Sequence, residues 1–177
     1  SIASGGNYNT VVGDEAGTDL TTGDNNVFVG YATGDVINTG LNNVAVGMAA
    51  LSSDTKGQDN VAIGHQSLFT QNFTSATSSY NVAVGKNAGF ALTTGTLNTL
   101  IGGLAGDAIT TASNNTAVGY VSLSGNTTGA NNVAVGANAL QPNTTGASNT
   151  AIGKGALASN TTASNNTAVG FESLVSN

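Results

Sequence analysis

Asn43-Val44-Ala45-Val46-Gly47 is the stretch that decides the fold, because the pattern Asn-x-x-(Val/Ile)-Gly recurs along the whole chain. The interval between repeats is 17 residues, except for one interval of 21 residues that carries a four-residue insertion within 71–80. The pattern begins at Asn9, Asn26, Asn43, Asn60, Asn81, Asn98, Asn115, Asn132, Asn149 and Asn166. A fixed short period of this kind predicts a solenoid of stacked coils.

The repeat is the structural unit, so we expect a single β-roll domain over residues 1–177 with ten coils. The chain opens at Ser1 without Met and stops part-way through its tenth repeat, so we also expect an excerpt of a longer protein. At about 4.8 Å per coil, ten coils predict a rod of roughly 45–50 Å.

Composition excludes several classes of partner. The formal net charge is −6, with three Lys or Arg residues in total, so no basic cluster is present to neutralise nucleic-acid phosphates or anionic lipids. The absence of Cys removes disulfide and thiolate chemistry. No apolar run approaches 18 residues, so we expect no membrane insertion by this segment.

Within each repeat, counted from its Asn as position one, position five is always Gly and position four is always Val or Ile. Runs such as Val-Ala-Val read as short strands with apolar residues on both faces, which belong in a covered parallel sheet. The recurrent Asn side chains are expected to form a ladder, each amide bonding its neighbours above and below. Position four is expected to form the structural core: Val12, Val29, Val46, Ile63, Val84, Ile101, Val118, Val135, Ile152 and Val169.

Each coil has one large aliphatic residue that stands either at position nine or at position twelve. Where position nine is Gly, position twelve is Leu or Ile, as in Gly17 with Leu20. Where position nine is Leu, position twelve is Asp or Asn, as in Leu140 with Asn143; Leu174 with Asn177 follows the same pattern. We expect each coil to deliver this residue to the same core slot by either of two routes.

The repeat continues with Thr-Thr-Gly or a close relative, as in Thr127-Thr128-Gly129. Thr favours strands, so a second short strand per coil is predicted, followed by a turn. The inserted residues within 71–80 should bulge as a loop from one face of the rod. Because each coil buries few apolar side chains, the outer strand face should be covered by other chains, and we expect an obligate oligomer.

Asn43-Val44-Ala45-Val46-Gly47-Met48-Ala49-Ala50-Leu51 resembles the head repeats of YadA-type trimeric autotransporter adhesins, whose consensus is near Asn-Ser-Val-Ala-Ile-Gly-x-x-Ala. Similar repeats, including Asn-Thr-Ala-Val-Gly followed by Asn-Thr-Thr-Gly, occur in phage tail-fibre proteins. The resemblance covers nearly the whole chain and implies a left-handed parallel β-roll, assembled as a homotrimer and displayed outside a cell or virion. The period of 17 departs from the family's usual period of about 14.

No residue set indicates catalysis, a cofactor or a metal. The single His65 occupies position six, which elsewhere holds many residue types, so an exposed turn residue is expected. Acidic residues gather early in the chain, but the glycine-rich pattern of calcium-binding rolls is missing. These acidic residues are Asp14, Glu15, Asp19, Asp24 and Asp35.

The sequence therefore predicts a non-enzymatic extracellular fibre on a bacterial surface that attaches to a host protein or glycan, or supports such attachment. A phage tail fibre is the alternative, and an ice-binding solenoid that uses its Thr rows is a third hypothesis. Variable positions and the inserted loop are the expected contact surfaces. The candidate contact residues are Tyr31, Met48, Phe73, Tyr120 and Phe171.

Overall fold

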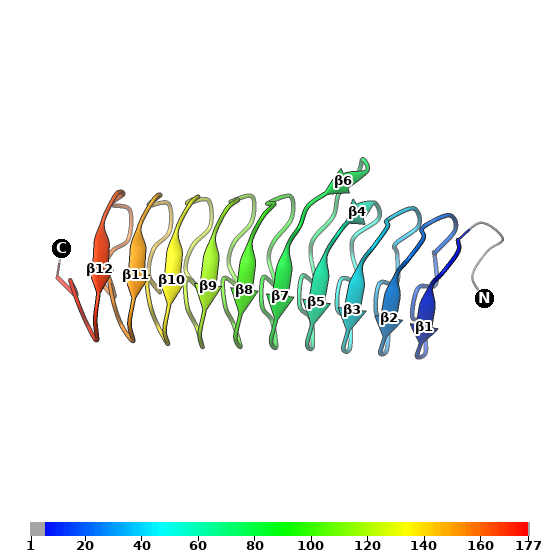
Figure 1. Ribbon diagram of the computed structural model, residues 1–177, viewed down its shortest axis with the longest axis horizontal. Coiled ribbons are helices and arrows are strands. Elements are labelled where there is room, and N and C mark those ends of the chain that lie inside the picture. The colour runs from blue at the N-terminus through cyan, green and yellow to red at the C-terminus, as the bar shows by residue number, and fades with distance from the viewer. Residues whose placement is uncertain (1–5, 177) are drawn as a thin grey trace.

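The computed structural model describes residues 6–176, which form a rod-shaped, all-β solenoid (Figure 1). Each coil contributes one three-residue strand to a ten-stranded parallel sheet, which confirms the predicted parallel β-solenoid. The strands of this sheet are β1 (Thr10–Val12), β2 (Val27–Val29), β3 (Val44–Val46), β5 (Val61–Ile63), β7 (Val82–Val84), β8 (Thr99–Ile101), β9 (Thr116–Val118), β10 (Val133–Val135), β11 (Thr150–Ile152) and β12 (Thr167–Val169). A second sheet pairs β4 (Gly57–Gln58) with β6 (Thr77–Ser78) beside the insertion.

Every strand pair is in register, so equivalent positions of successive coils lie directly over one another. Val44 of β3, for example, pairs with Val61 of β5. The insertion does not disturb this order, because β5 pairs with β7 at the same positions. The extra residues are therefore accommodated entirely at the upper edge of the rod, where Figure 1 shows β6 projecting.

The Asn side chains at position one are hydrogen-bonded from coil to coil, and those from Asn26 to Asn149 are buried. The Asn26 Oδ1 accepts hydrogen bonds from the Asn43 backbone N–H at 2.9 Å and from the Asn43 Nδ2 at 3.2 Å. The Asn43 Nδ2 also donates to the Gly57 carbonyl at 2.9 Å. Asn43 thus joins its neighbours and closes its own coil, because Gly57 lies 14 residues further along the same turn of the chain. Most position-one Asn residues repeat this closure, whereas Asn60 and Asn115 donate to carbonyls two residues earlier, those of Gln58 and Ser113.

The Gly at position five is required by its backbone conformation. Gly47 has φ of +127°, and a Cβ built there would lie 2.7 Å from the carbonyl carbon and oxygen of Gly64 in the next coil. The same geometry recurs at every position-five Gly from Gly13 to Gly153. Adjacent coils approach each other closely at this turn only because no side chain separates them.

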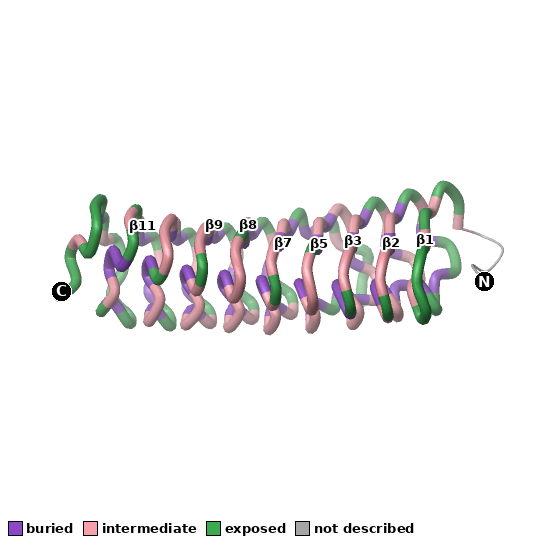
Figure 2. Tube along the Cα trace, turned by 90° about the horizontal axis from the view of Figure 1, so that it is seen from below, coloured by how far each residue is buried: buried purple, intermediate pink, exposed green. Residues whose placement is uncertain are grey.

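The prediction that position four forms the core is wrong for the single chain. The residue inside the coil is the one at position three, such as Phe28, Ala45 or Leu100, each fully buried. Strand side chains alternate between faces, so positions two and four share the outer face. Figure 2, coloured by burial, shows intermediate and exposed residues along these strands. The outward position-four residues are Val12, Val29, Val46, Ile63, Val84, Ile101, Val118, Val135, Ile152 and Val169.

In the coils from Leu20 to Leu157, the aliphatic residue of either position nine or position twelve fills the same core slot, as the sequence predicts. Leu20 and Leu140 reach the interior from position twelve and position nine respectively, and each is at most 1% exposed. Leu68 fills the slot from position nine as well, but its partner at position twelve is Gln71, a polar residue other than the predicted Asp or Asn. The partner of Leu174 at 177 lies outside the described residues. Position nine keeps a left-handed backbone in both arrangements, with φ of +56° at Gly34 and +50° at Leu140.

A large residue at position three is matched by Gly at position nine. A Cβ at Gly34 would lie 2.8 Å from the Phe28 ring, and a Cβ at Gly106 would lie 2.8 Å from Leu100. Three positions, rather than two, therefore share the volume of each coil. The position-twelve Asn residues form a second buried ladder, in which the Asn143 Nδ2 donates to the Asn126 Oδ1 at 2.8 Å.

The predicted second strand at the Thr-Thr pairs is absent from the described residues, where these pairs lie in bends. The first Thr of a pair stabilises the stack instead. The Thr127 backbone N–H and hydroxyl both donate to the Thr144 carbonyl of the next coil, at 2.8 and 3.0 Å. Gly, Asn, Asp and Ser lie close to these pairs in the chain, and their preference for turns overrides the strand preference of Thr.

Gly47→Ala should destabilise the rod by about 2–4 kcal/mol, because the left-handed backbone is strained for Ala and the added methyl meets the Gly64 backbone. Gly103→Ala is the matched control, since its Cβ would meet only the Tyr120 ring, at 3.6 Å. Chemical denaturation followed by circular dichroism measures both variants. Equal stabilities would contradict the assigned role of position five.

Leu140→Gly should cost about 2–5 kcal/mol through the cavity it leaves. Adding Asn143→Leu refills the slot but removes the acceptor for the Asn160 Nδ2, which donates to the Asn143 Oδ1 at 3.1 Å. The double variant should therefore recover only part of the loss. A double-mutant cycle measured by denaturation tests this, and purely additive losses would refute the shared slot.

Candidate functional site

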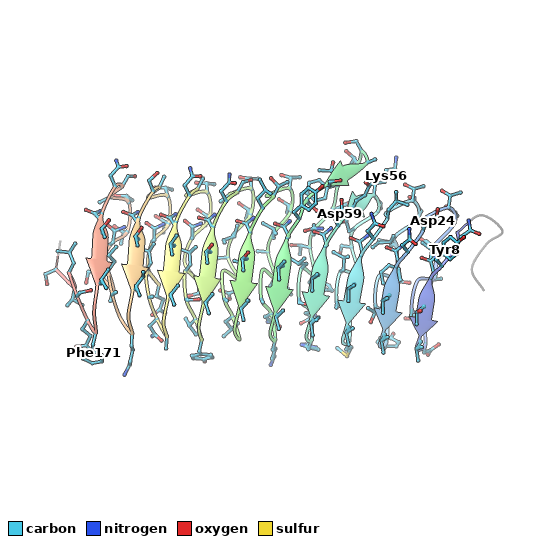
Figure 3. The ribbon with its side chains drawn as sticks, viewed as in Figure 1. Tyr8, Asp24, Lys56, Asp59 and Phe171 are labelled. Carbon is cyan, nitrogen blue, oxygen red and sulfur yellow. The ribbon has the colours of Figure 1, made fainter. Side chains whose placement is uncertain are left out.

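The candidate contact residues at position six form a row on the lower edge of the rod. Tyr31, Met48, Tyr120 and Phe171 are all exposed, and Figure 3 places Phe171 at this edge. They come from separate coils, and only Tyr31 and Met48 occupy neighbouring ones. Phe171 lies under the Lys154 ammonium, 5.6 Å from the ring centroid. This row offers a line of single contacts rather than a converging site.

Phe73 does not belong to the exposed surface, so its prediction as a contact residue is wrong. It lies at the base of the insertion, on the opposite edge from the position-six row, and is only 6% exposed. Its backbone N–H donates to the Asp54 Oδ1 at 3.0 Å, and its carbonyl accepts from the Thr55 hydroxyl at 2.9 Å. The sequence predicts that Phe73 projects from the inserted loop. In the structure it anchors the base of that loop instead.

The early acidic residues modify the environment of Tyr31. The Glu15 carboxylate accepts a hydrogen bond from the Tyr31 phenol and raises its pKa, with smaller contributions in the same direction from Asp14 and Asp35. The phenol stays protonated and able to donate at neutral pH. Among residues 6–176 these acidic side chains form no group of three or more metal-ligating residues.

His65 is half-buried rather than exposed, and its Nδ1 has no hydrogen-bond partner. No metal-ligating group of three includes it within the described part of the chain. A nearby feature that sequence reasoning missed is the stack of Phe69 on Phe90, with ring centroids 5.2 Å apart and planes 3° apart. Both occupy position ten of successive coils, so in-register stacking alone brings the rings together.

Asp107 extends the position-ten row from Phe90 into the next coil. Partial burial raises the pKa of its carboxyl, although the backbone N–H groups of Asp107 and Ala108 act in the opposite direction. Its Oδ1 has no hydrogen-bond partner. No pocket is present around these groups or elsewhere in residues 6–176.

The insertion is built on a fully buried carboxylate. The Asp54 Oδ1 accepts from the Gly57 N–H at 2.9 Å, the Phe73 N–H at 3.0 Å and the Lys56 N–H at 3.3 Å. Its Oδ2 accepts from the Gln71 Nε2 at 2.7 Å. Because a carboxylate is an acceptor on both oxygens, it can satisfy donors from both ends of the loop.

This network joins the insertion to the Asn ladder. The Gln71 Oε1 accepts from the Asn81 Nδ2 at 2.9 Å, and the Ser79 hydroxyl donates to the Asn60 Oδ1 at 2.7 Å. The sequence analysis did not identify Asp54 as a functional residue. Asp54 stands at position twelve of its coil, where its side chain is fully buried together with that of Leu51. The loop therefore leaves a fixed base, and its tip at 74–76 is exposed.

Asp54→Asn should destabilise the rod by about 1–3 kcal/mol, because the new amide cannot accept at both positions and leaves a buried donor unpaired. Rotating the Gln71 amide to compensate would break its bond from Asn81. Asp59→Asn is the matched control, with one side-chain bond from the Asn42 Nδ2 and an expected change within about 0.5 kcal/mol. Thermal denaturation compares the two, and equal losses would contradict the anchoring role.

Residues 6–176 contain no helix long and apolar enough to cross a bilayer. No family model, curated protein or solved structure matches the chain. Any assignment of function therefore depends on the geometry of the rod and its surfaces.

Proposed function

We propose that this chain is a non-enzymatic, extracellular attachment fibre: a segment of a bacterial surface adhesin, assembled as a homotrimer of left-handed parallel β-rolls. The observation that carries the proposal is the outer face of the ten-stranded sheet. Positions two and four of every strand point outward there and are Val, Ile or Thr in all ten coils. A continuous β-branched face of this length favours burial against another surface.

The outer face is accessible in the single chain. Ile101 is 39% exposed in the middle of the sheet, although its neighbours in the adjoining coils cover part of it. No Asp, Glu, Lys or Arg occupies position two or four, so the net charge of −6 lies away from this face. Other copies of the chain can therefore pack here without bringing like charges into contact.

A second copy is the partner whose surface has the same period. The outward residues repeat once per coil, so parallel copies present rows of equal spacing that stay matched along the whole sheet. A globular partner would match such rows over only a short distance. Self-association through this face would bury the apolar surface and leave both edges of the rod exposed. The resemblance to trimeric adhesins implies three chains in the assembly.

Attachment fits a rod whose edges carry the variable residues. Three parallel chains would present three copies of each edge residue, so weak contacts would be strengthened by avidity. The resemblance supports display on a bacterial surface, and a tail fibre of a phage is the alternative with the same rod. An outer-membrane anchor encoded downstream would favour the adhesin, and a virion-attachment domain encoded upstream would favour the tail fibre.

The ice-binding alternative depends on the Thr rows. The hydroxyls of the first row already donate to carbonyls of the next coil, as in Thr110 to Thr127 at 3.1 Å. The second row is exposed over five successive coils, from Thr94 to Thr162. Inhibition of ice recrystallisation by the wild-type protein, abolished by Thr128→Lys, would favour this alternative over attachment.

Ile101→Asp should convert the trimer to monomers, because three carboxylates would enter the apolar interface. Thr111→Asp is the matched control, since it adds the same charge at the exposed position fourteen of the same coil, outside the strand. Multi-angle light scattering at micromolar concentration gives the mass, and circular dichroism verifies the fold. A wild-type monomer, or a variant that remains trimeric, would overturn the proposed assembly.

A further inference from the structure

The insertion interrupts the repetitive surface of the rod that residues 6–176 form. It projects from the upper edge, where β4 and β6 form the second sheet (Figure 1). Its base is held by the buried Asp54 carboxylate, while Thr74, Ser75 and Ala76 at its tip are exposed. A loop that is fixed at its base and open at its tip can present side chains to a ligand at little cost in ordering.

The last residue of each coil, position seventeen in the regular repeat, has a left-handed backbone, as positions seven and nine also do. Its φ is positive in every coil, between +49° at Tyr80 and +64° at Asn165. This conformation suits Asn and Asp better than large side chains, and six of the ten residues in this column are Asn or Asp, with the small Ser148 as a seventh polar residue. The exceptions are Tyr8, Tyr80 and Leu97.

Two of these exceptions are neighbours at the insertion. Tyr80 ends the loop, Leu97 occupies the same position of the next coil, and the Leu97 N–H donates to the Ser79 carbonyl at 2.7 Å. Tyr80 is 56% exposed and Leu97 is 51% exposed. Both side chains therefore project from the rod beside the loop, where they are available to a ligand.

Polar groups surround this apolar pair. Asp59 precedes Tyr80 in the position-seventeen column, and its Oδ1 accepts from the Asn42 Nδ2 at 3.0 Å. Lys56 and Asp59 lie at the same upper edge beside β6 (Figure 3). Thr77 and Ser75 of the loop contribute further hydroxyl and carbonyl groups to this surface. The Thr77 hydroxyl donates to the Ser75 carbonyl at 3.0 Å.

We propose that Tyr80 and Leu97, with Asp59 and the loop at 74–78, form a binding site for a neutral glycan. A pyranose has an apolar face of C–H groups that packs on an aromatic ring, and a rim of hydroxyls that donate to carboxylates and accept from ammonium groups. The net charge of −6 and the Asp59 carboxylate disfavour acidic saccharides. The site rests on the proposed attachment function and gives it a ligand class.

Tyr80→Asn and Leu97→Asn test the site without straining the fold, because Asn is the commonest residue at position seventeen. Tyr8→Asn is the matched control: it makes the same exchange in the same backbone conformation, at a residue 86% exposed and separated from the loop by several coils. All three variants should melt at or above the wild-type temperature, since each relieves the same backbone strain.

The wild-type oligomer is titrated by isothermal calorimetry with neutral hexasaccharides of glucose, galactose, mannose and N-acetylglucosamine, and with an acidic hyaluronan hexasaccharide. We expect binding of at least one neutral sugar, no binding of hyaluronan, and affinity weakened by roughly tenfold or more in Tyr80→Asn and Leu97→Asn but unchanged in Tyr8→Asn. No sugar binding, or equal binding by Tyr80→Asn and wild type, would overturn the site. Light scattering and attachment to whole cells, measured on the same preparations, report separately whether the fibre function fails.

Discussion

The direct superposition of each coil on the next is the constraint on which the structure depends. Equivalent residues pair throughout the ten-stranded sheet, so every row of side chains has the spacing of hydrogen-bonded strands. This spacing allows the Asn side chains to bond in a continuous ladder and requires Gly where neighbouring turns approach closely. Any residue that disturbs one coil therefore affects both of its neighbours.

The interior of the coil adapts to this constraint by sharing volume among three positions. Phe28 at position three is accompanied by Gly34 at position nine, whereas Ala134 is accompanied by Leu140. Where position twelve does not supply the aliphatic residue, it supplies a polar group that bonds along the stack, such as Asn143. Close packing is maintained although no single position keeps a constant side-chain size.

Function is left to the surfaces that stacking does not determine. The outer sheet face is uniform and uncharged, which suits association of copies with the same period. The two edges differ, because the lower one carries scattered position-six residues and the upper one carries the insertion. Asp54 links these roles, since it replaces an uncharged residue of the core slot and fixes the loop beside Tyr80.

The sequence by itself determined the period, the strand at each Asn-x-x-(Val/Ile)-Gly and the exchange between positions nine and twelve, because each leaves a regular pattern of residue types. Only the tertiary structure decided that position three is inside and position four outside, since alternation separates two faces without saying which is enclosed. It also decided that the Thr pairs lie in bends, that Phe73 is buried and that Tyr80 has positive φ. The closure of each coil sets these features, and it depends on contacts between residues far apart in the repeat rather than on a local pattern.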